Sequence, residues 1–254
     1  LYGLVIPEYR REKHLIQEET ILDPNLPRFV AIDDHTDFFA YTMTCIAPPK
    51  TSTDKQGIVY LEKDARLTGT LDDHCKAIRM MENEEIEWEG KKFNRWIVWR
   101  IADPRVGMKD YKRGRTVIQD MMDSYQKCDY CNLPMKEMRV NNKKMGYCEA
   151  CKHYQEGIMI RPSHKDKERG ILLVRSALRF DTEKNMEPRL YLLKDARNTD
   201  YELRHWVYKN SKPEDKDDHW MSNIERLFQE ADFRYRERDS QGKPLDLKDY
   251  RWAS

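Results

Sequence analysis

The segment Arg28-Phe29-Val30-Ala31-Ile32-Asp33-Asp34 decides the fold that this sequence predicts. It is a short, apolar, β-branched run, which is typical of a buried strand, and it ends in acid. A carboxylate that follows such a strand is costly to bury unless a cation or a hydrogen-bond donor meets it. Asp33 is therefore a candidate functional residue at the end of a central strand.

Two later segments supply further acids in similar positions. Residues 96–102 form a second apolar run that ends at Asp103-Pro104, and Asp217-Asp218-His219 opens an amphipathic stretch of helical spacing. Because Mg²⁺ and Mn²⁺ prefer carboxylate oxygens, two strand-end acids and one helix-start acid together indicate a divalent-metal site. Each acid alone has a simpler explanation, since Asp33 could form a turn, Asp103-Pro104 could end a strand and Asp218 could be a helix N-cap.

The order of the remaining elements predicts the fold class. Apolar periodicity predicts strands at 28–34, 38–46, 58–62, 96–102, 157–161 and 190–193, and helices at 71–83, 117–125, 170–178 and 217–233. Three antiparallel strands, a helix, a further strand and then helices is the order of the ribonuclease H-like fold. We therefore expect an α/β chain with a mixed sheet flanked by helices. In that fold the first and fourth strands are neighbours, which would bring Asp33 and Asp103 to one edge.

Composition limits the possible classes of protein. Of the 254 residues 36% are charged, but the formal net charge is only +1, so any DNA binding must come from local patches. The sequence contains no apolar run long enough for a membrane span and no signal-peptide pattern. It begins at Leu1, almost inside a strand-like run, which suggests a fragment of a longer polypeptide.

Four of the six cysteines form two knuckles, Cys128-x-x-Cys131 and Cys148-x-x-Cys151. This spacing can supply four thiolates to one structural zinc ion. Two disulfides would need a secreted context that nothing in the sequence supports. The knuckles predict a zinc-ribbon-like insertion at 128–151 in a domain made of 1–127 and 152–254, whereas Cys45 and Cys75 are expected to be buried structural thiols.

Other charged residues near the acids have two interpretations. The basic residues that follow Asp103 could contact DNA phosphates, or they could form a solvated helix face. Auxiliary metal ligands could come from neighbouring acids, although exposed turn acids are the simpler interpretation. The basic residues are Arg105, Lys109, Lys112, Arg113 and Arg115, and the auxiliary acids are Asp34, Asp37 and Asp217.

The chain resembles the C-terminal nuclease domain of the large terminase subunit of tailed bacteriophages. The resemblance covers almost everything except the cysteine module, and it rests on the order and spacing of several segments. These are 3–9, 29–33, 101–104, 170–175, 188–191 and 217–227. The chain departs from the family pattern at Ala31 and His35, where glycines are common, and at Ser222-Asn223, where Asp-Ala is common. The cysteine insertion is not a general family feature.

The resemblance implies a metal-dependent endonuclease that cuts concatemeric viral double-stranded DNA during genome packaging, with low sequence specificity. Asp33, Asp103 and Asp218 would be the catalytic ligands of two Mg²⁺ or Mn²⁺ ions. Expected partners are DNA, an ATPase motor domain, the small terminase subunit and the portal protein, in the host cell cytoplasm. The sequence has no Gly-x-x-x-x-Gly-Lys-Ser/Thr motif, so the motor is expected outside this chain.

Two other functions compete with this hypothesis. One is a transposon-type ribonuclease H-like nuclease, in which a four-cysteine ribbon lies close before the last acid; here 66 residues separate Cys151 from Asp218. The other is a zinc-ribbon module that binds DNA or protein on an inactive scaffold.

Overall fold

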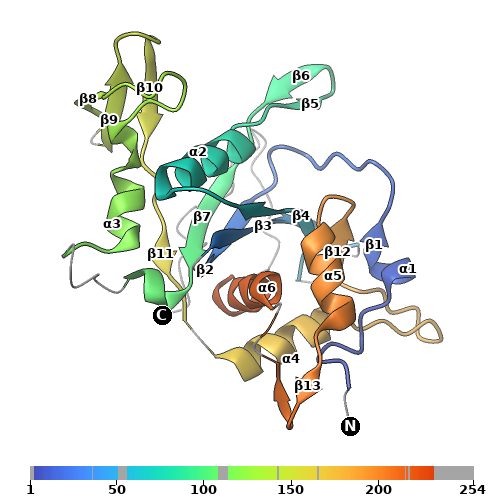
Figure 1. Cartoon of the computed structure of the whole chain (residues 1–254). Coiled ribbons are helices and arrows are strands. Elements are labelled where there is room, and N and C mark those ends of the chain that lie inside the picture. The colour runs from blue at the N-terminus through green and yellow to red at the C-terminus, as the bar shows by residue number, and fades with distance from the viewer. Residues whose placement is uncertain are drawn as a thin grey trace.

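The computed structural model describes residues 3–35, 37–50, 56–107, 114–141, 143–164, 166–214, 216 and 218–231. Its centre is a seven-stranded mixed sheet with the order β1-β12-β4-β3-β2-β7-β11 (Figure 1). The strands are β1 (Leu15–Ile16), β2 (Arg28–His35), β3 (Phe38–Ala47), β4 (Ile58–Leu67), β7 (Ile97–Ala102), β11 (Arg161–Pro162) and β12 (Leu190–Leu193). β2, β3 and β4 form an antiparallel meander, and β7 pairs with β2 in parallel. The predicted mixed sheet flanked by helices is confirmed.

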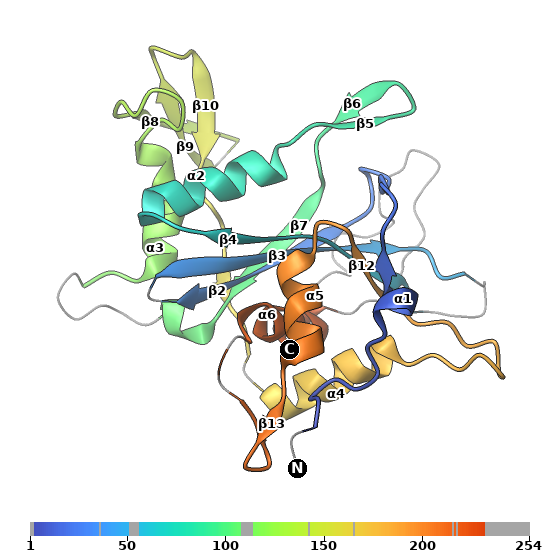
Figure 2. The same ribbon diagram turned by 45° about the vertical axis from the view of Figure 1, so that its right-hand side comes forward.

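Helices cover both faces of this sheet (Figures 1 and 2). The apolar side chains of α4, α5 and α6 share a core with one face, and those of α2 and α3 share a core with the other. The helices are α1 (Arg11–His14), α2 (Leu71–Glu82), α3 (Val117–Met122), α4 (Lys167–Leu178), α5 (Arg197–His205) and α6 (His219–Glu230), with 3₁₀ turns at Pro104–Gly107 and Ser124–Gln126.

Alternation along β2 decides which face its terminal acid takes. Phe29 and Ala31 lie in the core with α6, whereas Val30 and Ile32 lie in the core with α2. Because side chains of a strand alternate between faces, Asp33 follows Phe29 and Ala31 to the α6 face.

The sequence prediction fails for the strand expected at 157–161. Only Arg161–Pro162 pairs with the sheet, next to β7. The segment before it bonds to a helix end, since the Ile158 N–H donates to the Met121 carbonyl at 2.9 Å. The buried side chains of Ile158 and Ile160 still reach the core, which explains the apolar pattern.

The cysteine segment forms a separate small sheet, β8 (Lys136–Val140), β9 (Lys143–Cys148) and β10 (His153–Glu156), in the order β10-β9-β8. It stands beyond α3 on the α2 side of the main sheet (Figure 1). Its last strand lies after the predicted end at residue 151. Arg79 of α2 binds both carboxylate oxygens of Asp129 at 2.6 and 2.7 Å, which ties the first knuckle to the main domain.

Two further hairpins complete the described chain. They are β5 (Ile86–Trp88) with β6 (Lys91–Phe93), and β13 (Tyr208–Lys209) with β14 (Lys212–Pro213). Cys45 and Cys75 are both fully buried, as expected.

Gly157→Ala tests the packing between the module and the main domain. A Cβ at Gly157 would collide with the main chain of Met122, whereas a Cβ at Gly3 would have nothing within 4 Å. We expect Gly157→Ala to lower the free energy of unfolding by about 1–3 kcal/mol, the usual cost of overpacking. Gly3→Ala is the control and should change it by less than about 0.5 kcal/mol. Urea unfolding measures both; equal effects would contradict the close packing.

Candidate functional site

The pairing of β2 with β7 brings Asp33 and Asp103 together. Ile32 is opposite Ala102 in the register, and the Asp103 N–H donates to the Ile32 carbonyl at 3.1 Å. The next residue of each strand is an acid, and both acids are buried, with exposures of 4% for Asp33 and 0% for Asp103. Strand order and side-chain alternation thus place two carboxylates side by side on the α6 face.

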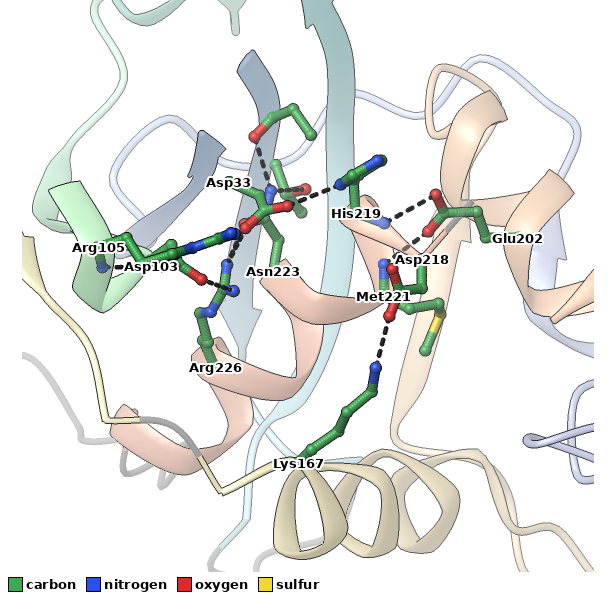
Figure 3. A network of polar contacts seen from close by, with 12 residues as sticks. Asp33, Asp103, Arg105, Lys167, Glu202, Asp218, His219, Met221, Asn223 and Arg226 are labelled. Carbon is green, nitrogen blue, oxygen red and sulfur yellow. Dashed lines mark hydrogen bonds and ion pairs between the residues drawn. The ribbon is translucent and has the colours of Figure 1, made fainter. Parts of the chain in front are cut away.

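Arg226 of α6 binds both of these acids (Figure 3). One guanidinium nitrogen lies 2.8 Å from Asp33 Oδ1, and the other lies 2.5 Å from Asp103 Oδ2. The remaining oxygens also have partners: Asp33 Oδ2 lies 2.8 Å from His219 Nδ1, and Asp103 Oδ1 accepts from the Arg105 side chain at 2.9 Å. Each carboxylate oxygen of the two acids thus contacts a basic side chain.

These contacts keep both acids ionised. Burial alone would raise the pKa of Asp33, but the hydrogen bond from His219 and the charge of Arg226 outweigh it, and the pKa lies below its ordinary value. Burial is likewise outweighed at Asp103, where the Arg105 hydrogen bonds and the Arg226 charge lower the pKa. The pair therefore carries two negative charges at neutral pH.

Asp218 lies at the N-terminus of α6 but does not cap it. Its side chain makes no capping hydrogen bond and instead accepts from Lys167 Nζ at 2.6 Å. Glu202 of α5 does the capping, since its carboxyl accepts from the backbone N–H groups of His219 and Met221 at 3.0 and 2.8 Å. The N-cap explanation for Asp218 is wrong, because another residue fills that role.

All three predicted acids line one cavity of about 650 Å³. Its wall also carries the basic side chains of Arg66, Arg105, Lys167, Lys216 and Arg226. Among the described residues, however, Asp33, Asp103 and Asp218 do not form a group of ligand atoms within 4.8 Å of one another. The acids thus share a cavity without forming a closed cluster.

Apart from Arg105, the remaining predicted site residues that the structure describes do not line this cavity. The lining of this cavity includes neither Asp34 nor Asp37. Arg115 is bound to Asp120 and Asp123 at 2.7 and 2.5 Å. Asp217, Lys109, Lys112 and Arg113 lie outside the described residues.

The cysteine knuckles form a second candidate site. Cys128 Sγ lies 3.9 Å from Cys151 Sγ, and Cys131 Sγ lies 3.5 Å from Cys148 Sγ. The Cys151 N–H donates to Cys148 Sγ, which lowers the pKa of that thiol to about 7. A thiolate at neutral pH is the form that binds zinc.

His153 adds a fifth potential ligand that the sequence prediction missed. Its Nε2 lies 4.0 Å from Cys128 Sγ. Potential ligand atoms of Cys128, Cys148, Cys151 and His153 all lie within 4.8 Å of one another, so a three-cysteine, one-histidine cluster could hold a metal such as zinc. Cys131 stays the predicted alternative for the fourth position.

Comparisons with known proteins bear on the fold. No protein-family model matches the sequence, and no curated protein is significantly similar to it. Among solved structures, the large terminase from a thermophilic bacteriophage matches with a TM-score of 0.55 and 13% identity, over 89% of this chain and 45% of that chain. The same terminase in complex with ADP matches with a TM-score of 0.57 and 14% identity, over 89% and 44%. The chain has a terminase-like fold.

The sequence of α6, the helix that completes the site, contains a pattern that indicates buried polar partners. His219, Asn223, Arg226 and Glu230 follow at helical spacing, beside the apolar stripe of α6. Such a polar stripe on an otherwise buried helix predicts buried partners. Lys167 and Glu202 gave no comparable signal, since their partners come from distant parts of the chain.

The zinc assignment predicts one ion per purified chain. Cys148→Ser removes a donor common to both ligand sets, so the variant should lose the ion. Cys75→Ser, at a buried thiol on the core face of α2, is the control and should keep it. Atomic emission measures the zinc content, and a full zinc content in Cys148→Ser would contradict the site. His153→Asn and Cys131→Ser then identify the fourth ligand by the larger loss of affinity.

Glu202 predicts how stability depends on pH. Burial is the main cause that raises the pKa of its carboxyl from the ordinary 4.5 to about 9, and the charge of Asp218 raises it too. The backbone hydrogen bonds to Glu202 act in the opposite direction but are outweighed. Between these values the folded chain keeps a proton that the unfolded chain has lost, so stability falls as pH rises. We expect the melting temperature in EDTA to fall from pH 5 to 9 more steeply for the wild type than for Glu202→Gln. Parallel curves would contradict this assignment.

Proposed function

We propose that this chain is a metal-dependent endonuclease that hydrolyses double-stranded DNA with little sequence preference, as the nuclease part of a large terminase subunit. The observation that carries the proposal is the pair Asp33 and Asp103, buried side by side where two parallel strands end, with Asp218 in the same cavity. The terminase-like fold supports it.

The donor set fits hard divalent cations. Asp33, Asp103 and Asp218 come from three elements and offer carboxylate oxygens to one cavity, and they would hold Mg²⁺ or Mn²⁺. A pair of such ions supplies an activated water and stabilises the leaving oxygen of a phosphodiester. The fit has one condition. One oxygen of Asp33 and one of Asp103 already contact Arg226, so an ion that uses these oxygens would have to take the place of that side chain.

The other side chains of the cavity would bind and orient the substrate. Arg66, Arg105, Lys167 and Lys216 surround the acids, and cationic side chains are the usual partners of DNA phosphates. His219 holds one Asp33 oxygen and thereby fixes the orientation of that carboxylate. Since such contacts read the backbone, we expect affinity to fall steeply with salt and to depend little on sequence.

The proposal includes partners that the chain itself does not contain. These are double-stranded DNA, an ATPase motor domain, the small terminase subunit and the portal protein, in the host cell cytoplasm. None of the described helices has the length and apolar character needed to cross a membrane.

Plasmid cleavage tests the proposal. Wild-type protein should nick and linearise supercoiled DNA with Mn²⁺ or Mg²⁺ and not with EDTA, whereas Asp33→Asn and Asp218→Asn should lose at least about 100-fold in rate, since each removes a charged ligand. Asp72→Asn, an exposed acid in the first turn of α2, is the matched control and should cleave normally. Circular dichroism checks that each variant is folded.

A second candidate function is a zinc-ribbon module that binds DNA or protein on an inactive scaffold. The position of Arg226 between Asp33 and Asp103 favours it, because a chain that never binds divalent ions at these acids would need such a permanent counter-ion. Folded wild type that does not cleave with any metal, or cleavage that survives both acid substitutions, would favour this function over the nuclease.

A further inference from the structure

Arg226 occupies the oxygens that a bridging metal ion would need. Its two terminal nitrogens contact Asp33 Oδ1 and Asp103 Oδ2, which belong to neighbouring strands. The acids offer no free oxygen on their other sides, because His219 and Arg105 hold those atoms. A divalent cation and this guanidinium therefore compete for the same ligand atoms.

Burial makes this contact a strong one. The side chains of Arg226, Asp33 and Asp103 have exposures of 6%, 5% and 0%. Two adjacent buried carboxylates repel each other, and this repulsion destabilises the fold unless a positive charge offsets it. Removing one partner of a buried ion pair also costs more free energy of unfolding than removing one partner of a surface pair. Arg105 is a weaker counter-ion for the pair, because its side chain is 65% exposed and, among the residues that the structure describes, its ion pair is with Asp103.

We propose that Arg226 is an internal counter-ion that competes with divalent cations for Asp33 and Asp103, so that metal binding at this pair requires its guanidinium to leave. The inference deepens the proposed nuclease function and rests on it. In the metal-free state Arg226 holds the two acids together. In the metal-bound state it is displaced, and the chain gives up two buried ion pairs to bind the ion.

The structure provides a path for this exchange. Arg226 itself lines the cavity of about 650 Å³, so its side chain can move into that space without unpacking the core. Asn223 Oδ1, one turn earlier on α6, lies 3.5 Å from the guanidinium and offers a neutral acceptor. A guanidinium displaced into this cavity would stay within the site and would be available to an incoming phosphate.

Metal titration tests the competition without using activity. Mn²⁺ binding is measured by calorimetry on the wild type, Arg226→Gln, Arg226→Lys and Arg175→Gln. Arg226→Gln removes the competitor, and we expect its Kd for Mn²⁺ to fall at least about tenfold, which corresponds to about 1.4 kcal/mol. Arg226→Lys should give a smaller gain, because an ammonium group cannot bridge two carboxylates as a planar guanidinium does. Arg175→Gln removes an arginine that is paired with Glu8, away from the cavity, and should leave the Kd unchanged.

Melting temperatures give a second measurement on the same proteins. In EDTA, Arg226→Gln should melt below the wild type, because its two acids are left unpaired, and Mn²⁺ should raise its melting temperature more than that of the wild type. If Arg226→Gln does not fold in EDTA, the comparison of Arg226→Lys with the wild type decides the question.

The outcomes separate this inference from the proposed function. Equal Mn²⁺ affinity in the wild type and both Arg226 variants overturns the competition and leaves the nuclease proposal intact. If no variant binds Mn²⁺ even at millimolar concentration, both fail. Tighter binding in Arg226→Gln, with Arg175→Gln unchanged, establishes Arg226 as the competitor whether or not the isolated chain cleaves DNA.

Discussion

Two ionised carboxylates buried against each other are the constraint on which the rest of this structure depends. Parallel pairing of β2 with β7 makes Asp33 and Asp103 neighbours, and alternation points both toward α6. Charges in such a position must be neutralised within the fold. The α6 helix meets that need by carrying Arg226 and His219 to the carboxylates, so its position is set by electrostatics as well as by packing.

The apolar stripe and the polar stripe of α6 must both face their partners for this arrangement to form. Met221, Ile224 and Leu227 are fully buried in the core under the sheet, which fixes the rotation of the helix. That rotation also aims the polar stripe, so that Asn223 donates to the Ala40 carbonyl at 2.8 Å while Arg226 reaches the acids. Close approach of α4 at Gly170, where a Cβ would press on Glu225 and Gln229, holds the helix from the other side.

The sequence predicted those parts that depend on local pattern. The strands and helices follow from apolar periodicity, which is a local property. The neighbouring positions of Asp33 and Asp103 were predicted by matching the order of these elements to the ribonuclease H-like fold. The counter-ions were not predicted, because which of many charged residues meets a given acid depends on the tertiary packing. Lys167 reaches Asp218 across 51 positions and Glu202 reaches His219 across 17. His153 was missed because it lies outside both knuckle motifs, although the next strand brings it back to the same point.

The double contact between Arg79 and Asp129 has a geometric consequence for the cysteine module. It fastens the module to α2, which lies on the opposite face of the sheet from α6 (Figures 1 and 2). The acidic cavity is lined by residues of α6, among them Asp33's partners His219 and Arg226. The described residues of the module therefore form no part of the wall of that cavity. The thiol cluster and the acidic cavity are thus separated by the main sheet, so a ligand bound to one does not contact the other.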